Sequence, residues 1–242
     1  MAKTGFFHHI GTFLLFIGTV LLVITTISSP IVDHIAIMNV KLANGTNTHD
    51  THVTMGTFGY CLLDAADGRD YCTGKHIGYN PASFLENIYD TDFNGAQVNT
   101  SKGLTRVMVL HPVACALAFI AFLSAASSGI CGALVGAITA SVAFIITVVV
   151  MATDFVLFGI IKSHVNDDGS GARAQFSTGM WTLVAAMACL FLGTIVVFFT
   201  CCSSRMHRQN HTSTKHAETG YANGTTVTKR HFWQRSSRRT RY

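Results

Sequence analysis

The stretch FFHHIGTFLLFIGTVLLVITTIS, residues Phe6–Ser28, contains no acid and no base. As a helix rising about 1.5 Å per residue, it is long enough to cross a hydrocarbon core of about 30 Å. Lys3 supplies a weak basic start, so a cleaved signal peptide is the alternative. However, the apolar run exceeds the core of about 7–15 residues found in such peptides, and Ser28-Ser29-Pro30 is a poor cleavage site. The stretch therefore favours a retained transmembrane helix.

Three more apolar runs follow at residues 107–126, 129–161 and 177–202, and Asp154 is the single charged residue within them. They account for a composition that is 49% hydrophobic and 12% charged, whereas about 25% of a soluble chain is charged. We predict an all-α membrane protein, a claudin-like tetraspan built on a four-helix transmembrane bundle. Its transmembrane domain covers residues 1–202, with helices at about 6–28, 107–126, 130–161 and 177–202.

The distribution of charge predicts the orientation. Residues 203–242, here called the tail, carry nine bases and one acid, a net +8. Residues 30–106 carry five bases and eight acids, a net −3. Because cations near the ends of spans stay in the cytoplasm, we predict a basic, disordered cytoplasmic tail and a cytoplasmic N-terminus. Residues 30–106 then form a large external loop.

Two pairs of cysteines suggest modifications. Cys61 and Cys72 lie in the predicted external loop, where an oxidising compartment favours a disulfide over two free thiols. Such a bond would stabilise the loop by about 2–3 kcal/mol. Cys201 and Cys202 end the last apolar run beside Arg205. Juxtamembrane cysteines next to bases are candidate palmitoylation sites, with ordinary apolar packing as the alternative.

The third apolar run is too long for a simple crossing. Its 33 positions, residues 129–161, would extend about 50 Å as a helix. If the helix enters the membrane at Ser128, Asp154 lies about 39 Å along it, at or beyond the outer surface. This position disfavours a proton relay or an ion site within the membrane. It predicts instead a helix that extends beyond the membrane and braces the external loop.

Small residues recur at four-residue spacing on two of the predicted helices. They let helix backbones approach in lipid, where no hydrophobic force drives association. We therefore predict helix packing rather than a ligand groove at these faces. The residues are Gly132, Gly136 and Ala140 on the third helix and Ala114, Ala118 and Ala121 on the second.

Several short segments of the external region stand out. The segment GTFGYC, residues 56–61, reads as a small disulfide-tied strand unit in which Gly56 and Gly59 permit bends and Phe58 and Tyr60 supply apolar faces. The others are ISSPIV at residues 27–32, HIGY at 76–79 and LHPVA at 110–114. LHPVA contains His111 and places Pro112 in the first turn of a helix, where a missing amide donor costs little.

These segments, in this order and together with the acid in ATDFVLFGII at residues 152–161, resemble the PalI family of fungal pH-response regulators. That family shares a superfamily with the eisosome tetraspans of the fungal cell cortex. The resemblance covers roughly residues 6–202 and leaves out the tail. The positions that carry it are Gly56, Phe58, Gly59, Tyr60, His111, Pro112 and Asp154.

The resemblance implies a non-catalytic protein of the plasma membrane that helps a separate seven-helix sensor of ambient pH to reach or stay in that membrane. Its partners would be membrane lipids, another membrane protein and a second copy of itself, without nucleic acid. The alternative within the superfamily is a self-associating organiser of cortical membrane domains. A transporter or channel ranks third, because no charged residue is predicted at mid-membrane.

Catalytic motifs are missing from the sequence. It holds no zinc-binding His-Glu-x-x-His pattern, no nucleophile elbow, no phosphate-binding loop and no dinucleotide fingerprint, so we expect neither enzyme activity nor a cofactor. His49, Asp50 and His52 lie close together, but the Thr- and Asn-rich stretch around them favours a solvated loop over a metal site.

Glycosylation sequons provide a test of orientation. Asn44 and Asn99 head sequons in the predicted external loop, where glycans are expected. Asn210 and Asn223 head sequons in the tail, which should stay unmodified.

Twelve histidines invite a pH-sensing hypothesis, since histidine titrates near neutrality. His76, His111 and His164 are predicted near the outer face, where His111 or His164 would be able to meet Asp154. The sequence favours the simpler interpretation that these are ordinary loop and interface residues and that the partner senses pH.

The basic tail has two explanations. The first is that its positive charge sets the orientation of the chain in the membrane, and the second is that it binds anionic lipid.

Overall fold

The computed structural model describes residues 6–32, 35–42, 51–65, 68–89, 95–127, 130–167, 169 and 171–218. Within these ranges four helices are long and apolar enough to cross a membrane, as the sequence predicted. They are α1 (Phe6–Thr26), α4 (Leu110–Ala126), α5 (Ile130–Asp167) and α6 (Thr178–Glu218). The chain divides into two compact units, Met1–Cys202 and Ser203–Tyr242, and the fold described here is that of the first.

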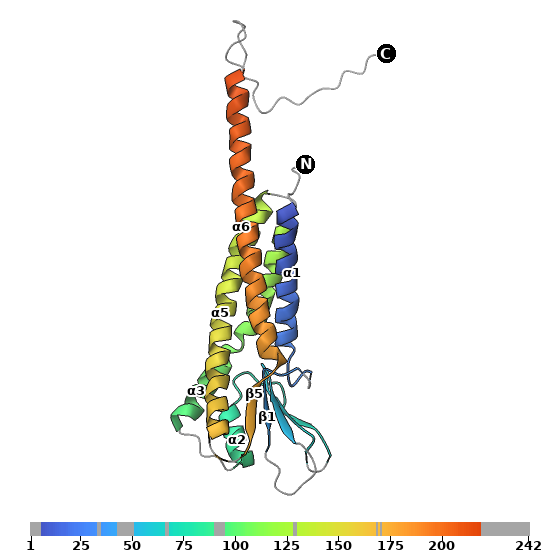
Figure 1. Ribbon diagram of the computed structural model, residues 1–242, viewed down its shortest axis with the longest axis vertical. Helices are drawn as coiled ribbons and strands as arrows, with labels where there is room; N and C mark the ends of the chain where they lie inside the picture. The colour runs from blue at the N-terminus through green and yellow to red at the C-terminus, as the bar shows by residue number, and fades with distance from the viewer. Residues whose placement is uncertain are drawn as a thin grey trace. The chain divides into compact units, whose positions relative to one another are not determined.

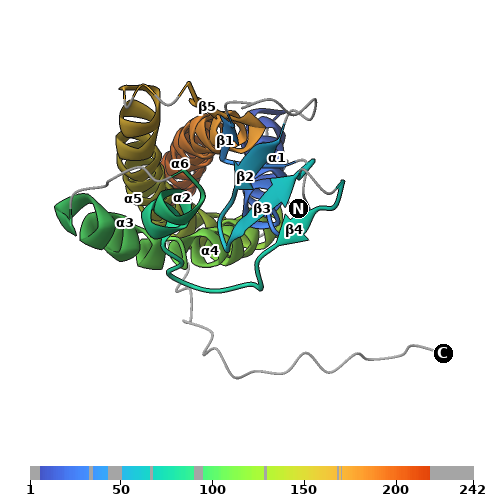
Figure 2. The ribbon, with the colours of Figure 1, turned by 90° about the horizontal axis from the view of Figure 1, so that it is seen from below.

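A five-stranded antiparallel sheet lies at one end of the four helices (Figure 1). The strands are β1 (Met38–Lys41), β2 (His52–Met55), β3 (Tyr60–Leu63), β4 (Tyr71–Cys72) and β5 (Arg173–Phe176), in the order β4-β3-β2-β1-β5. The strand unit predicted around GTFGYC is therefore part of a larger sheet. Figure 2 shows this sheet from below the view of Figure 1.

The connection between α5 and α6 is more than a simple loop. Helix α5 continues to Asp167, and β5 then pairs with β1, with Met38 opposite Phe176. The outer edge of β5 is covered at Ala174, whose N–H donates to the Asn166 side-chain oxygen at 2.9 Å. The Asn166 amide in turn donates to the Ala174 carbonyl at 3.3 Å. The side chain of Asn166 thus takes the place of a neighbouring strand.

Two short helices complete the region around the sheet: α2 (Pro81–Tyr89) and α3 (Gly95–Val107). We call the sheet together with α2 and α3 the cap. Helix α3 leads into α4 through Met108 and Val109, so the membrane-spanning helix expected to begin at residue 107 begins at Leu110.

The interior has two apolar cores, and α5 contributes to both. The bundle core contains Val150 of α5 with leucines and alanines of α1, α4 and α6. The cap core contains Leu157, Phe158 and Ile161 of α5 with residues of β1 and β2. Helix α5 therefore extends from the bundle into the cap, as its length predicted.

Helices α4 and α5 approach closely through small residues. On α4 the fully buried residues include Ala114, Ala118, Ala121 and Ala125. A β-carbon added at Gly136 would lie 2.8 Å from the Ala125 amide nitrogen, and one added at Gly132 would collide with the Ser127 hydroxyl. Ala140 is also buried in the bundle core. The predicted small-residue stripes thus lie at the contact between these two helices.

Helix α6 continues past the expected end of the last span. It runs to Glu218, so the prediction of a disordered tail is wrong for residues 203–218, while residues 219–242 lie outside the described part of the chain. The physical reason is that no glycine or proline occurs between Thr194 and Thr219, and nothing interrupts the ladder of helical hydrogen bonds.

Candidate functional site at the junction of bundle and cap

The segments singled out in the sequence meet where the bundle joins the cap. The end of α1 lies against the turn before β3: the Thr57 N–H donates to the Ser28 hydroxyl at 3.1 Å. The Thr57 hydroxyl donates to the Thr25 carbonyl at 3.1 Å. Because the last carbonyls of a helix have no partner within the helix, Thr57 satisfies one of them. ISSPIV and GTFGYC are thus joined by buried hydrogen bonds.

Gly56 allows these two segments to touch. A β-carbon added at Gly56 would overlap the Ser29 carbonyl oxygen and lie 2.7 Å from the Ser29 nitrogen. Both are backbone atoms, which cannot rotate away as a flexible side chain does. Only glycine fits this position without moving the backbone, which gives the first residue of GTFGYC a packing role.

HIGY is connected to the same place by Tyr79. The Tyr79 hydroxyl donates to the Gly56 carbonyl at 2.8 Å, and the Thr105 hydroxyl donates to the Tyr79 carbonyl at 2.7 Å. Burial raises the pKa of Tyr79 well above its usual value, and the negative charges of Asp154 and of ionised Tyr60 raise it further. The hydroxyl therefore keeps its proton and remains a donor.

His111 of LHPVA and Asp154 of ATDFVLFGII form a buried pair. His111 Nε2 lies 3.1 Å from Asp154 Oδ2, and the two side chains are 0% and 1% exposed. His111 Nδ1 lies 3.1 Å from the Met108 carbonyl oxygen. Asp154 lies between Val150 of the bundle core and Leu157 of the cap core. His164, the other histidine considered near Asp154, lies almost three turns further along α5.

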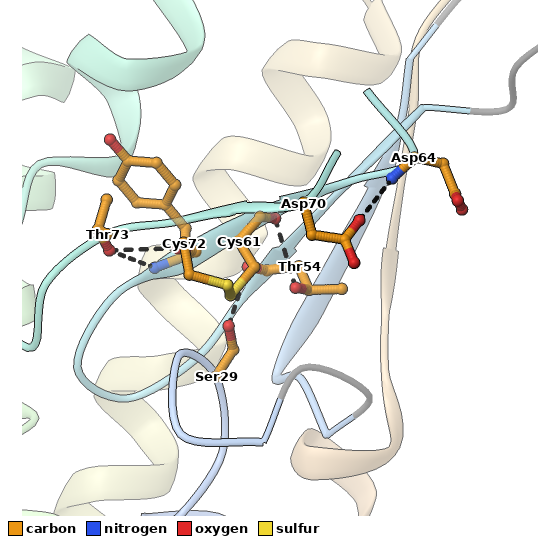
Figure 3. The surroundings of a disulfide bond; sticks show 8 residues. Ser29, Thr54, Cys61, Asp64, Asp70, Cys72 and Thr73 are labelled. Atoms are coloured by element: carbon orange, nitrogen blue, oxygen red, sulfur yellow. Dashed lines mark hydrogen bonds between the residues drawn. A yellow bond between two sulfur atoms is a disulfide. The ribbon is translucent and has the colours of Figure 1, made fainter. Parts of the chain in front are cut away.

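The predicted disulfide between Cys61 and Cys72 is present and joins β3 to β4 (Figure 3). The two residues face each other across the strands, with their Cα atoms 4.0 Å apart. Around the disulfide, the Thr54 hydroxyl donates to the Cys61 carbonyl, and the Asp64 N–H donates to Asp70 Oδ1 at 3.1 Å.

Replacing both Cys61 and Cys72 with serine is expected to lower the free energy of unfolding by about 2 kcal/mol, because the open chain regains the entropy of a short loop. The change should be measured by chemical unfolding of the purified chain in detergent micelles. A Cys189→Ser variant is the control, because Cys189 is a free cysteine on α6. Equal stability of the double variant and the wild type would contradict the prediction.

The remaining predicted residues are spread around this region. Tyr60 packs against Phe84, with ring centroids 3.5 Å apart, and Phe58 is half-buried. Pro112 lines an apolar groove of about 300 Å³ between α1 and α4. Asn99 is exposed on α3.

The candidate palmitoylation, glycosylation and metal residues are only partly described. Cys201 is buried on α6, and nothing is described for the side chain of Cys202. Asn44, His49 and Asp50 lie outside the described residues. Within the described ranges, no three His, Cys, Asp or Glu side chains are grouped closely enough to hold a metal ion.

Sequence reasoning did not assign roles to Ser28, Thr57 and Tyr79, although it quoted all three. Hydroxyl groups inside otherwise apolar segments were the available signal, since a buried hydroxyl needs a hydrogen-bond partner. The partners are far apart in the chain: Ser28 and Thr57, and Tyr79 and Gly56.

The fold and the junction define a class: four-span membrane proteins whose disulfide-tied β-sheet cap is joined to the bundle by buried polar contacts. A family model described as the SUR7/PalI family matches residues 7–193. The chain belongs to the SUR7/PalI family, which confirms the resemblance found in the sequence.

Two curated relatives are similar to part of the chain. The pH-response regulator protein palI/RIM9 of Emericella nidulans is 34% identical over 119 residues, which cover 48% of this chain and 18% of the relative. The pH-response regulator protein palI/prr-5 of Neurospora crassa is 30% identical over 112 residues, covering 46% of this chain and 14% of the relative. The matched segments thus span less than one fifth of either relative.

Proposed function

We propose that this chain is a non-catalytic protein of the plasma membrane that assists a complex signalling ambient pH. The observation that carries the proposal is the similarity to two proteins named pH-response regulators, within a family that matches residues 7–193. The junction supports a structural role, because its hydroxyl groups bond to other segments of the same chain.

In its finer form, the proposal is that the chain keeps a separate seven-helix sensor in the plasma membrane. A helix α5 that contributes to both cores ties the cap to the bundle, which suits a protein that presents one surface to a membrane partner. The cap would face outward and both termini would lie in the cytoplasm. The +8 charge of the tail supports this orientation.

The arrangement of the helices agrees with both termini lying on one side. His8, near the start of α1, contacts the carbonyl of Ala125, near the end of α4, at 3.0 Å. At the other end of the bundle the Gly179 N–H, at the start of α6, donates to the Ala36 carbonyl next to the sheet. The cap and the start of α1 therefore lie at opposite ends of the bundle.

The orientation predicts a glycan on Asn99 and none on Asn210. Treating the full chain, expressed in a fungal host, with an endoglycosidase is expected to increase its mobility on a gel. The Asn99→Gln variant should lose part of that shift, whereas Asn210→Gln should be indistinguishable from the wild type. A glycan on Asn210 would overturn the orientation, because only lumenal sequons are modified.

The functional experiment is complementation of an Emericella nidulans strain that lacks palI. Expression of this chain is expected to restore growth on alkaline medium and to return the seven-helix sensor to the plasma membrane. An empty vector and the native palI serve as controls. Expression of stable protein without recovery of either property would contradict the proposal.

A cortical membrane-domain organiser is the second candidate, because the matching family is described by SUR7 as well as PalI. In that case, deletion of the gene in its own host would disperse cortical patches and leave the alkaline response intact. The two curated relatives both favour the first candidate.

Palmitoylation of Cys201 and Cys202 is proposed as a further membrane anchor. The Cys201→Ser/Cys202→Ser variant is expected to lose acyl-exchange labelling, because both cysteines end the last span beside bases. The Cys115→Ser change, at a half-buried cysteine within α4, is the control, and it should leave the labelling unchanged. Equal labelling of the double variant and the wild type would rule out these sites.

A further inference from the structure

The apolar groove of about 300 Å³ between α1 and α4 lies in the half of the bundle next to the cap. One wall is formed by residues of α1 between Thr19 and Ile27, and the other by residues of α4 between Pro112 and Phe119. At about 1.5 Å per residue, the groove extends about 12 Å along α1. Because half of a hydrocarbon core is about 15 Å thick, the groove has the length of one lipid leaflet.

The hydroxyl groups that line the groove are already bonded within α1. The Thr19 hydroxyl donates to the Leu15 carbonyl at 2.8 Å. The Thr26 hydroxyl donates to the Leu22 carbonyl at 2.7 Å. The other side chains of the groove are apolar, so its occupant is held by apolar contact.

The size of the groove favours a lipid chain over a helix. One turn of a helix about 10 Å wide and about 5.4 Å high fills about 400 Å³, which is more than the groove holds. A single acyl chain is only one methylene group wide and can lie along the groove between the two helices.

The cap-side end of the groove is bridged by the segment HIGY. The His76 N–H donates to the Phe58 carbonyl at 3.0 Å, and Phe58 follows the threonine that is bonded to the end of α1. Gly78 packs against Arg106, about one turn before α4, because a β-carbon added at Gly78 would lie 2.8 Å from Arg106 Cγ. Residues 76–78 therefore reach from one wall of the groove to the other.

This end of the groove carries positive charge beside an exposed apolar side chain. Ile77 is 64% exposed, and Lys75 and Arg106 are exposed on either side of it. The sequence holds no acid at residues 71–79 or 95–112. An apolar side chain next to bases is typical of a surface that rests on a membrane, where the cations meet lipid phosphates.

The described acids near this part of the cap point elsewhere. Asp64 and Asp70 lie at the far end of β3 and β4, where the Asp64 N–H donates to Asp70 Oδ1 at 3.1 Å. Asp154 is buried against His111. The cap is acidic as a whole, but the cations above the groove are left to face an anion.

We propose that the groove and the two cations above it bind one phospholipid from the leaflet on the cap side. An acyl chain lies between α1 and α4, and the phosphate lies beside Lys75 and Arg106. The guanidinium group suits this ligand, because its planar set of donors matches phosphate oxygens. The bound lipid would connect HIGY and the two helices to the membrane surface. The site does not depend on the proposed function.

The test is native mass spectrometry of the purified full chain in a non-ionic detergent, titrated with dioleoylphosphatidylglycerol. One lipid per chain is expected to bind, and the binding should saturate. Dioleoylglycerol has the same chains without the phosphate, and glycerol phosphate has the phosphate without the chains. Each should bind at least about tenfold more weakly, because it makes only one of the two kinds of contact.

The Lys75→Gln/Arg106→Gln variant tests the contact with the phosphate. Loss of both cations is expected to weaken the binding of dioleoylphosphatidylglycerol by about tenfold or more. The matched control is Lys41→Gln/Arg173→Gln, which removes two exposed cations at paired positions of β1 and β5. It changes the net charge by the same amount and should bind the lipid as the wild type does.

The Ala116→Phe variant tests the groove itself. Ala116 lines the groove, and a phenyl ring there takes the place of the acyl chain, so binding should again weaken by about tenfold. The matched control is Ala185→Phe, at an exposed alanine that lies about as far from the start of α6 as Ala116 lies from the start of α4. It should bind as the wild type does.

Two results would overturn the proposal. The first is wild-type affinity in either test variant. The second is binding of many lipids without saturation, which would indicate a general lipid layer around the bundle. Should Ala116→Phe not fold, the charge variant decides, since both of its positions are exposed. Complementation in the fungal strain, whatever its result, bears only on the proposed function.

Discussion

Replacing His111 with alanine is expected to lower the free energy of unfolding by about 3–5 kcal/mol, because it leaves the Asp154 carboxyl group buried without its partner. Asp154 is 1% exposed, so water cannot reach the group unless the junction opens. The expected effect is the largest of any substitution considered for this chain. Equilibrium unfolding of the purified protein in mixed micelles at neutral pH measures it.

The matched control is His76→Ala, which removes an exposed histidine of the cap and should change stability by no more than about 0.5 kcal/mol. Adding Asp154→Asn to His111→Ala is expected to recover part of the loss, because the buried charge is gone. If the two substitutions instead destabilise independently and additively, the pair has no energetic coupling and the interpretation of the junction is wrong.

Replacing Gly56 with alanine is expected to destabilise the chain by about 3 kcal/mol or more, since the added methyl group overlaps the backbone of Ser29. Relief would require the turn before β3 to move away from the end of α1. That movement would also break the hydrogen bonds of Thr57 to Ser28 and to the Thr25 carbonyl. The same unfolding measurement gives the loss.

Gly103→Ala is the control for Gly56→Ala. Gly103 lies within α3 with open space where a β-carbon would be, and alanine favours a helix over glycine by about 0.5–1 kcal/mol. This variant should be as stable as the wild type or slightly more stable. A Gly56→Ala protein that matches Gly103→Ala in stability would show that the contact with Ser29 is not close in solution.

The sequence by itself determined the membrane architecture. The helices were predictable because lipid requires every span to be long, apolar and hydrogen-bonded within itself, which leaves a strong and local signal. The disulfide was predictable because Cys61 and Cys72 lie in the same region, set apart from the other cysteines. The family was recognisable from short segments that occur in a fixed order.

Only the tertiary structure decided how those segments meet. β5 joins β1 although more than 130 residues separate them, and a pairing between distant strands of four residues each leaves little trace in either strand. The partners of Thr57, Tyr79 and Asp154 likewise come from other elements, and no local pattern specifies which element that is. The sequence supplies these side chains. Their roles, however, depend on burial and on distances that arise only when the cap packs against the bundle.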